Sequence, residues 1–319
     1  MKKQILSVLL AVVLLFCLFP QIILSTSAVT YTGSCGENVT WAFDSEAETL
    51  RISGSGEMYN YKDYSTAPWY WARERIKYVV VEDGVTRIGS YAFYFMRNFD
   101  SILLPDSVTV IGSFAFYNTC VSTVVLPEYL TSIEEGAFSK SSLKNIRLPE
   151  SLISIGADAF SYTAALESIR IPHSVTSIGT RAFMGSNLRD IMLSGSLTKI
   201  EPQLFWDSQL TSVTIPDSVS TIGYQAFRGC ANLSSVTFSN NLKTIEHQAF
   251  RDCNSLKTVV IPYSVETIES SAFDCGSLTA IVVLNPDCVI STGGVISENS
   301  GNTLGRREIV TIYGYENST

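Results

Sequence analysis

The residues best suited to acid–base or metal chemistry are few and far apart. The chain of 319 residues has two histidines, His173 and His247. They occupy different positions within a sequence unit that recurs along the chain. At the spacing of stacked strands, they would lie roughly 14 Å apart. That distance excludes a shared metal ion or a proton relay between them. The sequence therefore predicts surface histidines rather than a catalytic or metal-binding pair.

Other catalytic patterns are missing from the sequence as well. Serine is abundant because it belongs to the repeated phrase, so no single hydroxyl stands out as a nucleophile. We find no phosphate-binding glycine loop, nucleophile elbow, zinc-protease motif or calcium loop. The adjacent acids Glu134 and Glu135 fall in a turn without a partner pattern, which favours a solvated turn. We therefore expect a non-enzymatic protein with no cofactor.

Cysteine spacing favours thiols over disulfides. Cys230, Cys253 and Cys275 each lie three residues before a leucine that opens a predicted strand. Equivalent positions in stacked units form a column with a spacing of about 4.8 Å, and parallel side chains suit buried thiols better than a bridge. Whether these three or Cys35, Cys120 and Cys288 form disulfides is left open by the sequence.

The feature that must position all of these residues is a repeat. An Ala-Phe pair recurs every 22 or 23 residues, with Leu204-Phe205 as the single variant. A fixed period of this length indicates stacked units that cannot bury their apolar sides alone. The nine phenylalanines are Phe93, Phe116, Phe138, Phe160, Phe183, Phe205, Phe227, Phe250 and Phe273.

Within each unit, two short segments precede the Ala-Phe pair. Residues Leu143–Leu148 alternate inward and outward side chains, which is typical of a strand. A Pro-x-Ser segment closes it, and the following Ser-Val-x-x-Ile is too short for a helix and predicts a second, weaker strand. The fold class predicted is a repeat solenoid, mainly β and right-handed, with a parallel sheet, short strands and a short helical turn at each Ala-Phe.

Composition divides the chain into four predicted parts. Residues 1–28 have two lysines, an apolar stretch and small residues, as a secretory signal peptide does, and the apolar stretch Ile5–Phe19 is short for a membrane span. Residues 29–75 do not repeat and predict an N-terminal cap with a hairpin. Residues 76–284 form the solenoid. Residues 285–319 predict a C-terminal cap or tail, with a Gly/Ser/Asn-rich loop and a last strand at 308–313.

Charge limits the class of partner. The formal net charge is −8, and removal of Lys2 and Lys3 would bring it to about −10. Nucleic-acid-binding proteins need a basic surface, so nucleic acid is excluded as the main partner. No second long apolar run is present, so we expect no transmembrane segment in the mature chain.

The repeated phrase, as in Ile261-Pro262-Tyr263-Ser264-Val265 followed by Ala272-Phe273, resembles the BspA-like, Treponema pallidum-type leucine-rich repeats over about residues 76–284. This family is associated with secreted or surface proteins, and several members are adhesins or bind host matrix proteins. The resemblance implies extracellular localisation and a role in adhesion or protein–protein interaction, with a host matrix or envelope protein as partner. Relatives often continue into a further helix, so an incomplete C-terminal cap is expected.

The repeat units differ most at the outward-facing strand positions. The predicted partner-binding site is based on these positions. Two neighbouring outward columns have apolar ends and a basic middle, which Glu167 and Asp190 partly cancel. On an acidic protein, a local basic strip can steer an acidic partner, although an ordinary solvated sheet face has similar residues. The predicted partner-binding residues are Lys144, Arg147, Arg170, Arg189 and Met192.

Aromatic residues suggest an alternative. Trp41, Trp69 and Trp71 lie in the predicted cap together with several tyrosines. Exposed rings could stack on sugars, which would make the protein a carbohydrate-binding or envelope-associated structural module. A cap that covers the first turn of the solenoid needs the same residues for packing, and we favour that interpretation.

Overall fold

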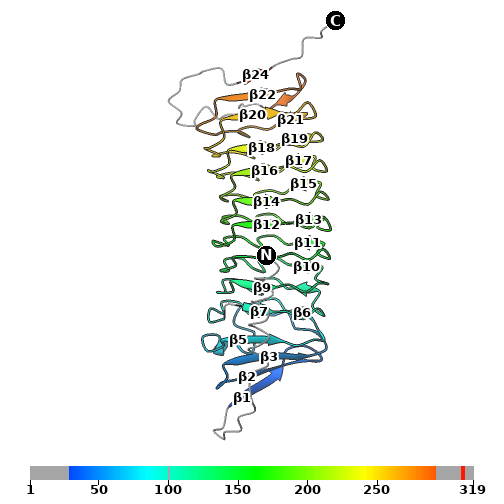
Figure 1. The fold of residues 1–319 in the computed structure, drawn as a ribbon, viewed down its shortest axis with the longest axis vertical. Coiled ribbons are helices and arrows are strands. Elements are labelled where there is room, and N and C mark those ends of the chain that lie inside the picture. The colour runs from blue at the N-terminus through cyan, green and yellow to red at the C-terminus, as the bar shows by residue number, and fades with distance from the viewer. Residues whose placement is uncertain (1–28, 100, 292–309, 313–319) are drawn as a thin grey trace, which may run out of the picture.

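The computed structural model describes residues 29–99 and 101–291, together with the backbone of 310–312. The predicted signal peptide and most of the predicted C-terminal loop and closing segment lie outside the described residues. The described chain rises from β1 (Thr30–Ser34) through a stack of similar coils to β24 (Val310–Ile312) (Figure 1). The parallel solenoid predicted from the repeat is confirmed.

The first half of nearly every repeat adds a short strand to a parallel row, here called the sheet face. Paired strands are in register, so that Ile169 lies beside Ile191 and Arg170 beside Met192. The row consists of β5 (Tyr78–Val81), β7 (Ser101–Leu103), β9 (Thr123–Val125), β12 (Ser168–Arg170), β14 (Asp190–Met192), β16 (Ser212–Thr214), β18 (Ser235–Thr237), β20 (Thr258–Ile261), β22 (Ala280–Val283) and β24 (Val310–Ile312).

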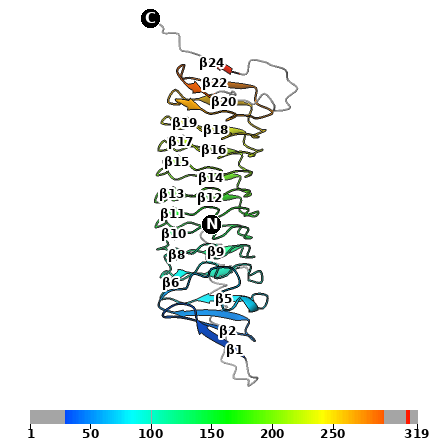
Figure 2. The same cartoon turned by 180° about the vertical axis from the view of Figure 1, so that it is seen from behind.

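The predicted second strand of each unit is also present, as two-residue strands in nearly every coil. This row is parallel too, and both rows run along the long axis of the molecule, as Figure 2 shows from behind. It consists of β4 (Gly56–Glu57), β6 (Val85–Ile88), β8 (Val110–Ile111), β10 (Ser132–Ile133), β11 (Ser154–Ile155), β13 (Ser177–Ile178), β15 (Lys199–Ile200), β17 (Thr221–Ile222), β19 (Thr244–Ile245), β21 (Thr267–Ile268) and β23 (Val289–Ile290).

The helical turn predicted at each Ala-Phe pair is instead a run of hydrogen-bonded turns, here called the turn face. In one coil the Ala115 N–H donates to Gly112 O, and the Phe114 N–H between them donates to Glu135 O in the next coil. Phe114 and Asn118 both have positive φ, at 56° and 54°. A positive φ at the third position of a four-residue turn is what a type II turn requires. Alternating bonds within and between coils therefore replace a helix.

Stacked phenylalanine rings fill the interior. Successive ladder rings from Phe93 to Phe273 have centroids 5.0–5.7 Å apart, and most are within 10° of parallel. All nine rings are fully buried. The inward strand column is buried as predicted, except that Ile146 and Val236 are partly buried. The Ala-Phe pair thus has a packing role in every coil.

The N-terminal residues extend the solenoid with antiparallel strands. β1 (Thr30–Ser34), β2 (Val39–Asp44) and β3 (Thr49–Gly54) pair in order, and β3 joins β5 in parallel. The predicted hairpin is therefore confirmed. The one short helix among the described residues, η1, spans Tyr70–Ala72. Just before it, Trp69 stacks on Phe93 at 6.2 Å and donates its indole N–H to Ala92 O. Trp69 thereby covers the first ring of the ladder.

The predicted cysteine column is present. Cys230, Cys253 and Cys275 are buried free thiols, and each donates a hydrogen bond to the carbonyl of the ladder phenylalanine one coil earlier, at 2.9–3.1 Å. Burial raises the pKa of the Cys230 thiol to about 12. It also raises the pKa of Cys35 to about 12. These thiols pack as small buried side chains, and their protonated form is the stable one.

Thiol titration should distinguish the buried, protonated cysteines from the accessible ones. At pH 8, Ellman's reagent should react quickly with Cys120 in the chain without residues 1–28, since Cys120 is the exposed cysteine, and more slowly with half-buried Cys288. The other four should react only after unfolding, because the thiolate is the reacting species. The Cys120→Ser variant should lose the fast phase. Rapid reaction of three or more thiols in the native protein would contradict this arrangement.

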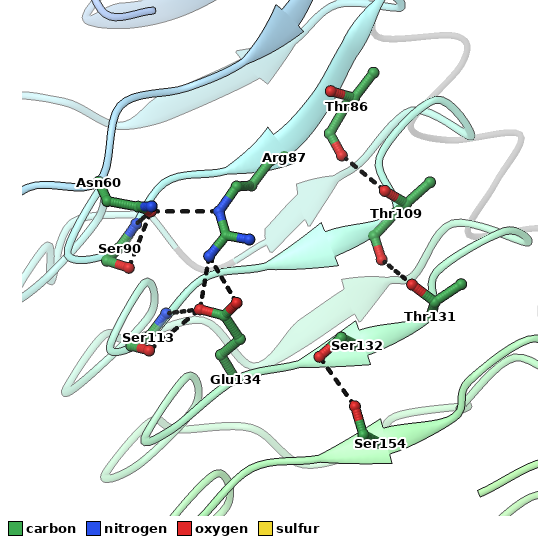
Figure 3. Close-up of polar contacts among 10 residues, drawn as sticks. All are labelled: Asn60, Thr86, Arg87, Ser90, Thr109, Ser113, Thr131, Ser132, Glu134 and Ser154. Atoms are coloured by element: carbon green, nitrogen blue, oxygen red, sulfur yellow. Dashed lines mark hydrogen bonds and ion pairs between the residues drawn. The ribbon is translucent and has the colours of Figure 1, made fainter.

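A three-coil ion pair ties the lower solenoid together (Figure 3). Arg87 Nη2 lies 2.7 Å from both carboxylate oxygens of Glu134, 47 residues later. Glu134 also accepts the backbone N–H and the hydroxyl of Ser113 in the intervening coil. A Cβ at Gly112 would meet the preceding coil at 2.6 Å, so this position allows close packing between the two ends of the pair. The expectation that Glu134 is a solvated, unpartnered turn acid is therefore wrong.

A second ion pair of the same kind lies in a later part of the solenoid. Lys199 Nζ lies 3.1 Å from Glu246, again 47 residues later, and Glu246 accepts the N–H of Tyr224. In both cases glutamate stands where other units have glycine. Its carboxylate satisfies a turn N–H of the preceding coil, and the ion pair spans two coil steps.

Removing this carboxylate should cost stability. The side chains of Arg87 and Glu134 are only 15% and 30% exposed. Glu134→Gln should therefore destabilise the fold by about 1–3 kcal/mol, as loss of a partly buried, charge-assisted network does. The matched control is Glu266→Gln, whose pair with Lys243 is 64% and 50% exposed and should be worth less than about 1 kcal/mol. Equal urea midpoints for the two variants would contradict the role of the three-coil pair.

Candidate functional site

The sheet face presents the predicted site residues outward. Lys144, Arg147, Arg170 and Arg189 are all exposed, and Met192 is 61% exposed. Their exposure follows from strand alternation, because the neighbouring Ile169 and Ile191 point into the core. The five predicted site residues thus point outward, as predicted.

The row of strands is interrupted at the coil that contains Lys144 and Arg147. On the sheet face, between β9 and β12, this coil forms one isolated bridge, Thr123 to Asn145, in place of a strand. The Leu143–Leu148 segment matches the repeat closely, so its sequence predicts a strand that the structure lacks. Arg147 lies in the interrupted coil, and β12 belongs to the coil that follows it.

A shallow depression of about 370 Å³ lies at the interruption. It brings together three of the five predicted residues, Arg147, Arg170 and Met192, and leaves Lys144 and Arg189 outside its lining. The remaining lining residues are Asn145, Ile146, Ser168, Ile169 and Asp190. Asn145 and Ser168 were missed by the sequence argument, because neither charge nor size distinguishes them from their column neighbours.

The charges of the depression are unevenly compensated. Arg170 pairs with Glu150 at 2.7 Å, and both side chains are about 60% exposed, so solvent weakens this pair. Among the described residues, no carboxylate lies within 4.0 Å of the Arg147 guanidinium. Asp190 is the one acid in the lining. The depression therefore offers one uncompensated and one weakly compensated guanidinium beside an exposed thioether.

Apolar residues flank this basic centre on the sheet face. Leu103 is 55% exposed, Val125 45% and Val260 57%. Leu103 and Val125 are direct neighbours in β7 and β9, and contiguous exposed apolar side chains are typical of interaction surfaces. The basic middle and apolar ends predicted from the sequence are both observed.

The histidines and the other possible catalytic or metal-binding side chains do not come together in one site. His173 lies beside Ser196 and His247 beside Ser270, in separate parts of the solenoid. His247 also stacks on Tyr224. In the part of the chain that the structure describes, no three His, Cys, Asp or Glu side chains are close enough to hold a metal ion. The same part has no helix long and apolar enough to cross a bilayer.

The cap tryptophans are mostly packing residues. Trp69 is fully buried and Trp41 is 7% exposed, and the two rings meet edge to face at 5.9 Å. Trp71 is 50% exposed, but its ring packs against Tyr31 at 4.7 Å. The cap therefore offers no open row of tryptophan faces on which a sugar chain could stack.

Comparison with solved structures finds leucine-rich-repeat proteins of several bacteria. One from Eubacterium ventriosum is 21% identical, with 91% of this chain and 98% of that chain covered and a TM-score of 0.47. A leucine rich cell surface protein from Faecalibacterium prausnitzii is 22% identical, covers 91% and 100%, and has a TM-score of 0.37. The leucine-rich-repeat protein of T. pallidum is 24% identical, covers 68% and 86%, and has a TM-score of 0.41.

A search of curated proteins finds no significant match. The family model for the BspA type leucine rich repeat region matches residues 69–189 and 198–292 in six copies, which is more than half of the chain. The match covers the solenoid with its sheet and turn faces, and on this evidence the chain belongs to the BspA-type leucine-rich-repeat family.

Proposed function

We propose that this protein is a secreted or cell-surface, non-enzymatic module that binds another protein through its sheet face. The observation that carries the proposal is the depression at Arg147, Arg170 and Met192, set between exposed apolar residues. Arginine and methionine are enriched at the centres of protein interfaces. The proposed partner is a host matrix or envelope protein that presents an acidic patch with apolar flanks. The secreted location is supported by the signal-like sequence of residues 1–28.

The binding energy would come from two sources. Exposed Leu103, Val125 and Val260 would supply apolar burial on both sides of the centre. Arg147 would supply a guanidinium for bidentate pairing with a carboxylate, as interface arginines commonly do. Because the whole chain is acidic, attraction would be confined to this part of the surface and would align the partner with it.

A capture experiment tests the proposal. The chain without residues 1–28, immobilised on a resin, should retain a protein from matrix or envelope extracts at low salt. Retention should fall as salt rises, because the centre of the contact is charged. A resin carrying the protein with the Arg147→Glu and Arg170→Glu substitutions should retain none of that partner. Retention of the same protein by both resins would reject the proposed surface.

A further inference from the structure

A second depression lies on the turn face, away from the sheet face. It has a volume of about 190 Å³ and lies beside the ring of Tyr117. Tyr94 and Tyr117 stand directly after ladder phenylalanines in consecutive coils, and their rings stack at 4.8 Å and 5°. In the next two coils the equivalent residues are serines, Ser139 and Ser161. The outer aromatic column therefore stops at Tyr117 and leaves a notch of about one ring's size above it.

The floor of this notch is polar and fixed. Ser139 and Ser161 are buried, and their hydroxyl oxygens lie 2.8 Å apart in a hydrogen bond. Each hydroxyl has one proton and two lone pairs, so the pair can still accept a hydrogen bond from a ligand.

One wall combines a cation with two rings. Lys140 follows Tyr117 by one coil, so it lies on the side of the Tyr117 ring that Tyr94 does not cover. Its ammonium is 5.3 Å from the centroid of Tyr117 and 5.9 Å from that of Tyr162. No carboxylate within the described residues pairs with it at 4.0 Å or less. This cation is held in place by ring contacts and is available to an anionic group.

The opposite wall holds a carboxylate in a fixed orientation. Arg181 Nε and Nη2 both donate to Asp158, at 2.8–3.2 Å. The pair is neutral as a unit, and the carboxylate keeps lone pairs that can accept hydroxyl protons. Lys140 is therefore the one charged residue in the lining of the notch that has no ion-pair partner among the described residues.

Backbone geometry keeps these walls in position before any ligand arrives. Phe114, Lys140, Asp158 and Tyr162 all have φ between 54° and 57°. At Gly136, also with positive φ, a Cβ would lie 2.4 Å from the Phe114 ring, so that ring packs flat against the glycine. Coil-to-coil hydrogen bonds fix this conformation, as from Lys140 N–H to Ser161 O at 2.8 Å. A preformed site loses little entropy on binding.

We infer that this notch binds a single carboxylated sugar at the end of a glycan. The apolar face of the pyranose would enter the notch beside the Tyr117 and Tyr162 rings, and its carboxylate would meet the Lys140 ammonium that lies near both ring centroids. Sugar hydroxyls would donate to Asp158 and to the serine floor. The overall charge of −8 disfavours a polyanionic chain, whereas one terminal acid adds a single charge that Lys140 neutralises.

Calorimetry with 3′-sialyllactose and lactose tests the inference. The chain without residues 1–28 should bind sialyllactose at least about ten-fold more tightly than lactose, because lactose lacks the carboxylate that Lys140 would pair with. Equal affinity for the two sugars, or no measurable binding of sialyllactose, would overturn the inference.

Two variants locate the site. Tyr117→Ser continues the serine column of the next two coils, and Lys140→Asn uses a residue that tolerates positive φ. Each should weaken sialyllactose binding at least about ten-fold, a typical loss for one stacking or charged contact. The matched control is Tyr224→Ser, a second turn-face tyrosine that stacks on a neighbour and lies outside the notch. Unchanged affinity in the two notch variants, with normal circular dichroism, would overturn the assignment.

Discussion

The Phe160→Ala variant should lose about 3–5 kcal/mol of unfolding free energy, the range for a fully buried phenylalanine. Its ring has neighbours at 5.6 Å and 5.5 Å, Phe138 and Phe183, which stack on its two faces. Their coils are tied to its own by backbone hydrogen bonds of 2.8 Å, from Phe138 N–H to Ala159 O and from Phe160 N–H to Ala182 O. The cavity therefore cannot collapse without breaking these bonds, which places the cost at the upper end.

Urea unfolding followed by circular dichroism measures this loss. The matched control is Met192→Ala, which removes a large side chain that is 61% exposed and should change stability by less than about 0.5 kcal/mol. A loss below about 1.5 kcal/mol in Phe160→Ala would mean that neighbouring coils close the gap. The continuous ring stack would then not be the main source of cohesion between coils.

Charge reversal at the sheet-face depression should have the largest effect on binding. Replacing Arg147 and Arg170 together by glutamate should weaken the captured partner's affinity by at least about thirty-fold, the effect of losing one interface hot spot of about 2 kcal/mol. Two former cations would then repel the acidic patch of the partner. Thermal stability should be unchanged, because both side chains are exposed.

A control variant with the same charge reversal at another place distinguishes the effect of local charge from the effect of net charge. Lys62 and Arg97 are both exposed and lie off the sheet face. The Lys62→Glu and Arg97→Glu double variant has the same net charge as the sheet-face variant. Titration by surface plasmon resonance should show wild-type affinity for this control. An equal loss in both variants would indicate a general charge effect and would contradict a local site.

The period made most of the scaffold predictable. Identical units must stack like residues over like, so the inward strand column, the phenylalanine ladder and the Cys230–Cys275 column all follow from position within the phrase. The hairpin before the solenoid was predictable from alternation near Trp41 and Ile52, which pair directly in the structure.

The turn face was not predictable from residue type. Left-handed backbone normally favours glycine or asparagine, yet here Phe114, Arg181 and Gln203 adopt it. Hydrogen bonds to the next coil select this conformation, and a single unit contains no sign of them. The ion pair of Arg87 and Glu134 was missed for a related reason, since its partners are 47 residues apart and meet only after stacking.

The candidate site was predicted in part. Column alternation placed Arg147, Arg170 and Met192 outward, and that is where they lie. The interruption at Asn145, where the depression lies, could not be foreseen, because this segment fits the repeat as well as its neighbours do. The same holds for the turn-face notch, which depends on small serines above Tyr117 rather than on any motif.

Site-specific photo-crosslinking gives the most direct test of binding through the sheet face. Benzoylphenylalanine at Ser168, within the depression, should crosslink the captured partner, and the same group at Tyr129 or Tyr263 should not. Those two tyrosines are 64% and 65% exposed and lie in loops outside the strands of the sheet face, so they control for accessibility. Crosslinking from Ser168 alone is the predicted result. Crosslinking from Tyr129 or Tyr263 without any from Ser168 would contradict it.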